Sequence, residues 1–152
     1  MQTIVRKDTN VSLYYLADSK TVDIGSNQTT IIDEDGTPEL IISDCNTSNA
    51  TLHQGVDALS DYWGWKYKHD GSAWSANTDF KGINLLSSDI NDSVTTIPVG
   101  ISNPFTASGT VQIGDEKIAY TGVDGTNLTG CTRASASTSA ASHAAHAQVT
   151  QV

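Results

Sequence analysis

Hydrophobic and polar residues alternate most regularly between residues 110 and 133 (TVQIGDEKIAYTGVDGTNLTGCTR). Two alternating runs, 110–113 and 116–120, flank a turn that begins at Gly114, and this pattern predicts a β-hairpin. A second turn contains Gly125, and another apolar run follows it. We therefore expect a three-stranded meander, which needs a further surface to bury its apolar face.

Shorter alternating runs predict strands in the rest of the chain. They occupy residues 1–7, 11–17, 21–25, 29–33, 40–43, 94–99 and 148–152. Two interpretations of residues 1–7 are open, a first strand or an arm that extends a neighbouring subunit's sheet. Residues 44–60 are polar and predict a loop. Residues 134–147 (ASASTSAASHAAHA) predict a loop that wraps the second domain.

The stretch from 61 to 77 (DYWGWKYKHDGSAWSAN) concentrates large aromatic residues. By alternation, Trp63, Trp65 and Tyr67 share one strand face, Gly71 lies in a tight turn, and Trp74 returns on the partner strand. The predicted aromatic ladder has three interpretations: the core of the first domain, a stacking platform for a sugar, or a protein interface.

Composition supports the same fold class. The polar residues are mostly Ser, Thr, Asn and Gly, which suit strands and tight turns better than long helices. We expect an all-β protein with two small sandwich-like or barrel-like domains, residues 1–81 and 82–152, each containing hairpins and long polar loops. Each would be marginally stable alone, so oligomerisation or docking on a larger assembly is expected.

Charge and cysteine content exclude several classes of function. The net charge of −9 disfavours direct binding to nucleic acid. No apolar run reaches the roughly 20 residues of a membrane span, and the first residues lack the order of a signal peptide. Cys45 and Cys131 are far apart in sequence, and we expect two buried thiols rather than a disulfide.

No pattern in the sequence predicts a metal or cofactor site. The acidic turn 33–36 lacks the spacing of a calcium loop, and His143 and His146 lack a third ligand. Glu116 and Arg133 both lie in patterned regions, and we expect them to form a structural ion pair.

Glycine positions mark the expected turns. They are Gly71, Gly109, Gly114 and Gly125, and a positive φ is expected at Gly109 and Gly125 in particular.

An ordered series of short motifs runs through residues 83–152. It comprises LLSS (85–88), TTIPV (95–99), Phe105, Gly109, IGDEKIAYTG (113–122), LTGCTR (128–133), AASHA (140–144) and Val149. This series resembles a small β module that recurs in bacteriophage virion proteins, often at the end of tail or other particle proteins. At Ala134 and His146 the chain departs from the glycine that is usual in the module. The resemblance implies a structural part of a phage particle and assigns no catalytic residue.

The first hypothesis is therefore a non-enzymatic virion protein without a cofactor, made in the host cytoplasm and located in the virion. Its expected partners are the major capsid protein or tail proteins, with homo-oligomers in the particle and without contact to nucleic acid or membrane. Capsid decoration, as a cement protein, is favoured over a tail-associated subunit (tip, neck or fibre adaptor), because the chain lacks heptads and long repeats.

A second hypothesis is a module that binds carbohydrate or a host receptor through Trp63, Trp65 and Trp74. An enzyme is the third and least favoured, because the four histidines have no recognisable nucleophile or metal partner.

Overall fold

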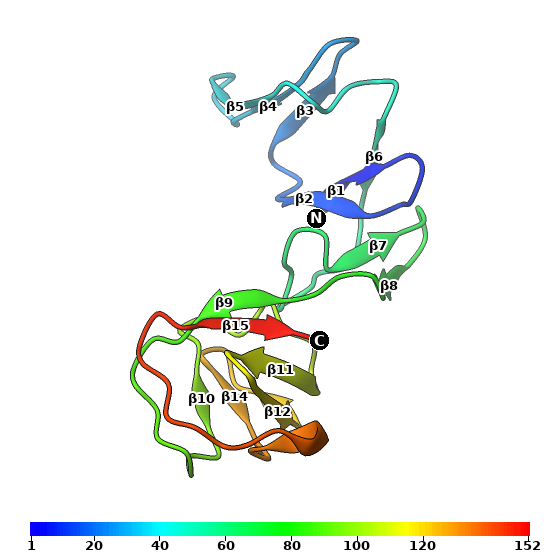
Figure 1. Cartoon of the computed structure of the whole chain (residues 1–152). Helices are drawn as coiled ribbons and strands as arrows, with labels where there is room; N and C mark the ends of the chain where they lie inside the picture. Colours follow the sequence, from blue (N-terminus) through cyan, green and yellow to red (C-terminus); the bar gives the residue numbers. More distant parts are fainter. The chain divides into compact units, whose positions relative to one another are not determined.

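The chain is all-β in the computed structural model, which describes residues 1–152. Its strands form five small antiparallel sheets, and one short 3₁₀ helix, η1 (Ser135–Ser137), completes the regular structure (Figure 1). The chain divides into two compact units, Met1–Phe80 (unit 1) and Lys81–Val152 (unit 2). The structure contains no helix with the length and apolar character that a membrane span requires.

Unit 1 contains eight strands in three sheets, ordered β2-β1-β6, β3-β4-β5 and β7-β8. The strands are β1 (Gln2–Arg6), β2 (Ser12–Leu16), β3 (Thr21–Ile24), β4 (Thr29–Ile32), β5 (Pro38–Ile42), β6 (Ala50–Gln54), β7 (Tyr67–His69) and β8 (Trp74–Ala76). Consecutive strands pair through short turns in β3-β4-β5, as the alternation in residues 21–43 predicts.

Strand β1 is the centre of its sheet. It pairs with β2 along one edge and with β6 along the other, so both rows of its main-chain groups are engaged. Residues 2–5 are buried, and Thr3 bonds both the Ser12 hydroxyl and the Tyr14 carbonyl. The first-strand interpretation of residues 1–7 is confirmed, and the arm interpretation is wrong because this strand has no free edge.

Strand β6 lies inside the segment that the sequence predicts to be a loop. Its residues, ATLHQ, are mostly polar, so the apolar alternation is short. Long-range pairing supplies the order instead, because Leu52 lies opposite Ile4 in the register of β1. The loop prediction for residues 44–60 is therefore wrong at 50–54.

Unit 2 contains seven strands in two sheets, ordered β12-β11-β15-β9 and β10-β14-β13. The strands are β9 (Ile83–Leu85), β10 (Ile97–Pro98), β11 (Gly109–Ile113), β12 (Glu116–Tyr120), β13 (Gly122–Val123), β14 (Asn127–Thr129) and β15 (Gln148–Gln151). The predicted strand 94–99 is thus reduced to two residues, and the predicted last strand is β15.

The predicted hairpin is confirmed, whereas the meander is wrong in its third strand. β11 pairs with β12 in the expected register, in which Ile113 lies opposite Glu116 across Gly114. The chain then leaves this sheet, and β13 and β14 pair with each other in the second sheet. The second sheet supplies the surface that the hairpin needs, because Ile118 and Leu128 are fully buried in the same cluster.

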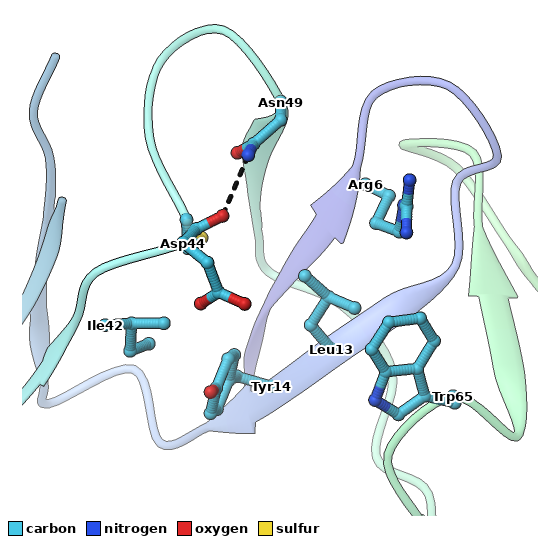
Figure 2. A pocket seen from close by; sticks show the side chains of 8 residues that line it. Arg6, Leu13, Tyr14, Ile42, Asp44, Asn49 and Trp65 are labelled. Atoms are coloured by element: carbon cyan, nitrogen blue, oxygen red, sulfur yellow. Dashed lines mark hydrogen bonds between the residues drawn. The ribbon is translucent and has the colours of Figure 1, made fainter. Parts of the chain in front are cut away.

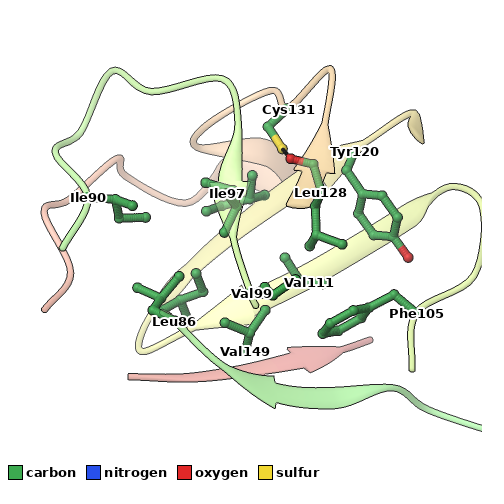
Figure 3. Close-up of a cluster of buried hydrophobic side chains, with 12 residues drawn as sticks. Leu86, Ile90, Ile97, Val99, Phe105, Val111, Tyr120, Leu128, Cys131 and Val149 are labelled. Carbon is green, nitrogen blue, oxygen red and sulfur yellow. Dashed lines mark hydrogen bonds between the residues drawn. The ribbon is translucent and has the colours of Figure 1, made fainter. Parts of the chain in front are cut away.

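The two units differ in the size of their cores. Twelve buried hydrophobic residues form one cluster in unit 2, and Figure 3 shows side chains from both of its sheets converging there. The cluster in unit 1 contains only five: Ile4, Ile31, Ile42, Cys45 and Ala50. Both cysteines, Cys45 and Cys131, are buried free thiols, as expected.

Residues 134–147 wrap unit 2 without forming a long helix, as predicted. The segment is held by main-chain bonds, among them a reciprocal pair between Ile90 and His143 and a bond from the His146 N–H to the Leu86 carbonyl. Ala134 and His146 have left-handed backbones, with φ of 55° and 68°. Glycine would adopt this conformation at either position without steric cost.

Three of the four selected glycines have a positive φ: Gly71 (101°), Gly114 (56°) and Gly125 (98°). The prediction of a turn at Gly109 is wrong, because Gly109 begins β11 and has no positive φ. A Cβ there would lie 3.1 Å from the Tyr120 hydroxyl, so a close side-chain contact explains the small residue.

Candidate functional site

The aromatic stretch does not form the predicted ladder. Trp63 and Trp65 lie outside any strand, and only Tyr67 and Trp74 belong to the β7-β8 hairpin. Residues 64–66 turn, and Trp65 has a φ of 72°. The alternation of 63, 65 and 67 resembles a strand, but the backbone turns at Gly64 before β7 begins.

Trp74 belongs to an aromatic cluster within unit 1. It makes edge contacts with Tyr15, Tyr62, Tyr67 and His69, at ring-centroid distances of 4.7–6.3 Å. Its indole N–H donates to a backbone carbonyl at 3.0 Å. Tyr67 and Trp74 are half-buried in this aromatic cluster and lie outside the apolar core cluster of unit 1, so their ring contacts hold the β7-β8 hairpin on the unit.

Trp63 and Trp65 are different, because both are strongly exposed, at 40% and 51%. Trp65 lines a pocket of about 400 Å³ within unit 1. Figure 2 shows this pocket, which we call the Trp65 pocket. Its lining residues are Arg6, Leu13, Tyr14, Ile42, Asp44, Cys45, Asn49 and Trp65.

The Trp65 pocket is assembled from distant parts of the sequence. Strands β1 and β2 contribute Arg6, Leu13 and Tyr14, and the end of β5 with the segment after it contributes Ile42 and Asp44. Figure 2 places the Asp44 carboxylate between Ile42 and Tyr14, while Arg6 and Trp65 lie together on another side.

The backbone of Trp65 is fixed at both ends. Its N–H donates to the Ser12 carbonyl at 2.8 Å, and its carbonyl accepts from the Asn77 side chain at 2.8 Å. Arg6 lies over the indole, with 6.0 Å from the guanidinium carbon to the ring centroid. The Arg6 guanidinium is oriented by Asp8, which accepts from Nε and Nη2. The ring therefore has a defined position although half of it is open to solvent.

Polar groups in the pocket remain available to a ligand. Asn49 is engaged, since its amide donates to the Asp44 carbonyl. The Asp44 carboxylate and the Tyr14 hydroxyl make no hydrogen bond within the chain. Burial, together with the nearby Asp44 carboxylate, raises the pKa of Tyr14 further above neutral pH. The pocket thus combines apolar walls with a few converging polar groups, as small-molecule sites do.

Unit 2 contains a second polar assembly, the Glu116 clasp, made of Glu116, Arg133 and His143. Arg133 holds both carboxylate oxygens of Glu116, through Nε at 2.8 Å and Nη2 at 2.7 Å. His143 Nε2 lies 2.9 Å from Oε2, and the backbone N–H groups of Ala134 and Ala141 donate to the same carboxylate at 3.1 Å. Glu116 and Arg133 therefore occur as the bidentate ion pair that their positions suggested.

The Glu116 clasp joins four segments of unit 2. Glu116 lies on β12, Arg133 follows β14, and His143 belongs to the wrapping segment, while the Arg133 guanidinium also donates to the Asn91 carbonyl. The Glu116 side chain is 1% exposed. Burial alone would raise its pKa, but the bonds from Arg133, His143 and the two backbone N–H groups outweigh burial and lower the pKa to about 2. The Glu116 clasp therefore holds these segments of unit 2 together through charged hydrogen bonds.

The other histidines do not belong to any group of side chains that could bind a metal ion. His53 and His69 lie with their rings 5.3 Å apart, and His69 Nδ1 accepts the Gly71 N–H at 3.1 Å. No group of three or more His, Cys, Asp or Glu side chains is placed to hold a metal ion. Asp33 of the acidic turn pairs with Lys20 at 2.9 Å.

Comparisons of the chain with models of protein families, with curated proteins and with solved structures found no match.

Sequence patterns missed most of the Trp65 pocket. Arg6, Tyr14 and Asp44 belong to separate predicted elements, and nothing local indicates that they meet. His143 was missed as a partner of Glu116, although both residues lie in the motifs of the resemblance, GDE and ASH. That shared membership is the one signal that could have linked them.

Proposed function

We propose that the chain is a non-enzymatic structural protein of a bacteriophage particle. The observation that supports this proposal is that residues from three of the phage-like motifs contact one another in unit 2. Glu116 from GDE, Arg133 from CTR and His143 from ASH meet in the Glu116 clasp. These motifs thus serve to hold a fold, which is the use expected of a structural module.

The left-handed residues of the wrapping segment support the same proposal. The module has glycine where this chain has Ala134 and His146, and both positions have a positive φ here. Positive φ is the physical reason for glycine at such positions. The positive φ at both positions therefore supports the resemblance, because glycine is the residue favoured in this conformation.

Each unit also has an edge strand with exposed aliphatic side chains, as expected of a protein that docks on an assembly. β5 is the edge of β3-β4-β5 and exposes Leu40 (43%) and Ile41 (54%). β9 is the edge of the four-stranded sheet and exposes Ile83 (56%) and Leu85 (47%). Such edges offer both unpaired main-chain groups and apolar surface to a partner.

Within this proposal we favour decoration of the capsid, as a cement protein, over a tail-associated role at the tip, neck or fibre adaptor. Both units are compact, and the chain contains no coiled-coil or repeat segment of a fibre shaft. The partners are then capsid proteins and further copies of this chain.

Incorporation into particles tests the proposal. Particles produced with the wild-type chain and purified through a density gradient should contain it in constant ratio to the major capsid protein, by quantitative mass spectrometry. Leu85→Lys, on the β9 edge, should lower that ratio. Val123→Lys should not, because its strand β13, at the edge of the other sheet, is only two residues long and exposes a single large aliphatic side chain. A chain that separates from the particles in the gradient would refute a virion role.

A further inference from the structure

Trp65 is the residue whose identity the fold of unit 1 explains least. A bulky side chain at φ of 72° is sterically unfavourable, and glycine would adopt the same backbone without that cost. The backbone bonds of Trp65, to Ser12 and Asn77, do not depend on the indole. The residue as a whole is 51% exposed. Strain of this kind, at a side chain that buries little, is typical of binding sites.

The surroundings of Trp65 are those of a ligand site. The indole and Leu13 provide apolar contact, and the Asp44 carboxylate and Tyr14 hydroxyl are unengaged within the chain. Asp8 takes Nε and Nη2 of Arg6, which leaves Nη1 to donate to a ligand. A carboxylate acceptor, a guanidinium donor and a hydroxyl beside an aromatic ring match the alternating C–H faces and hydroxyl groups of a sugar.

We propose that the Trp65 pocket binds a neutral saccharide, with one pyranose ring stacked on the exposed part of the Trp65 indole and its hydroxyls bonded to Asp44, Tyr14 and Arg6. The pocket volume of about 400 Å³ lies within the roughly 300–1,000 Å³ of small-ligand sites. The proposal concerns unit 1 alone and does not rest on a role in a phage particle.

Charge determines the class of saccharide. Unit 1 has five Lys and Arg against twelve Asp and Glu residues, and Asp44 lines the pocket, so acidic sugars are repelled. A cationic ligand is disfavoured as well, because the Arg6 guanidinium already lies over the indole and would repel a second cation there. Neutral hexoses and N-acetylhexosamines remain.

The test is NMR titration of the full chain, with the three indole N–H resonances as reporters. The probes are maltotriose, N,N′-diacetylchitobiose and a mannotriose, with 3′-sialyllactose and choline as charged comparisons. At least one neutral probe should shift the Trp65 resonance with a Kd of about 1 mM or tighter. Trp65→Gly should weaken that binding by about tenfold or more, with little change in the thermal midpoint of unit 1. Trp63→Ala should bind like wild type, since Trp63 is exposed outside the pocket.

A second variant keeps the proposal falsifiable if Trp65→Gly does not fold. Asp44 is exposed and its carboxylate is unpaired, so Asp44→Asn should fold normally and weaken binding. The proposal is wrong if no neutral probe shifts the Trp65 resonance at about 10 mM, tenfold above that Kd. It is equally wrong if only sialyllactose or choline binds, or if binding survives in both variants.

Discussion

Neutralising Glu116 should strongly destabilise unit 2. The side chain is 1% exposed, and its two oxygens accept from Arg133, two backbone N–H groups and His143. Glu116→Gln keeps the shape of the side chain but removes the charge. The glutamine NH₂ group would face N–H donors at either oxygen position, because both Glu116 oxygens accept hydrogen bonds. The substitution also leaves Arg133 buried without its counter-ion.

The magnitude follows from the pKa of Glu116. A pKa lowered from 4.5 to about 2 corresponds to about 3 kcal/mol of stabilisation of the charged form in the folded state. Removing one partner of a buried ion pair costs about 3–5 kcal/mol in other proteins, which agrees. A unit of this length has roughly 4–11 kcal/mol of stability in total. The thermal midpoint of unit 2 should therefore fall by about 12–24 °C.

Calorimetry of the full chain at neutral pH measures this shift. Tryptophan fluorescence identifies the unit 1 transition, because Trp63, Trp65 and Trp74 all lie in unit 1. The matched control is Asp115→Asn, an exposed neighbour in the same turn, which should change the stability by less than about 0.5 kcal/mol.

Acid titration provides an independent check on the same residue. Because the pKa of Glu116 is lower in the folded chain, its contribution is complete above about pH 4.5 and is lost as the pH falls toward 2. Glu116→Gln should lack this part of the acid dependence. A variant within about 1 kcal/mol of wild type, with unchanged acid sensitivity, would refute the structural importance of the clasp.

Two further predictions concern the backbone of the wrapping segment and a buried histidine. Ala134→Gly should raise the stability of unit 2 by about 0.5–1 kcal/mol, because the relief of steric strain at a φ of 55° exceeds the entropic cost of glycine. The control Ala144→Gly, at a position without a positive φ, should lower the stability. Urea titration measures both changes. Burial, with the nearby His53, lowers the pKa of His69 below 6.5, so the unfolded chain takes up the proton first. The stability of unit 1 should decline as the pH falls below about 6.5, and His69→Gln should remove that decline, as followed by the fluorescence of Trp74, which packs on His69.

The sequence predicted the β11-β12 hairpin correctly because residues close together in the chain determine that structure. The β11-β12 hairpin combines strict alternation with a turn at Gly114, so its register follows from about ten residues. The same reasoning failed for Trp63 and Trp65, because alternation alone cannot distinguish a strand from a turn that presents the same side chains. β6 was missed because its pairing with β1 is a long-range effect.

The Trp65 pocket lay beyond sequence reasoning for a related reason. Its members come from β1, β2, the end of β5 and the turn before β7, and only the packing of unit 1 brings them together. The Glu116–Arg133 pair was accessible, since each charge lies within a patterned β region where an unpaired charge would be costly. The contribution of His143 depends on the path of the wrapping segment, which a low-complexity sequence does not specify.

Localisation of the chain in the phage particle by cryo-electron microscopy tests the central proposal most directly. We expect density for both all-β units on the outer surface of the particle, in icosahedral copy number if the chain decorates the capsid and in a few symmetric copies if it belongs to the tail. Complete particles that carry no density for either unit would contradict a structural role in the virion.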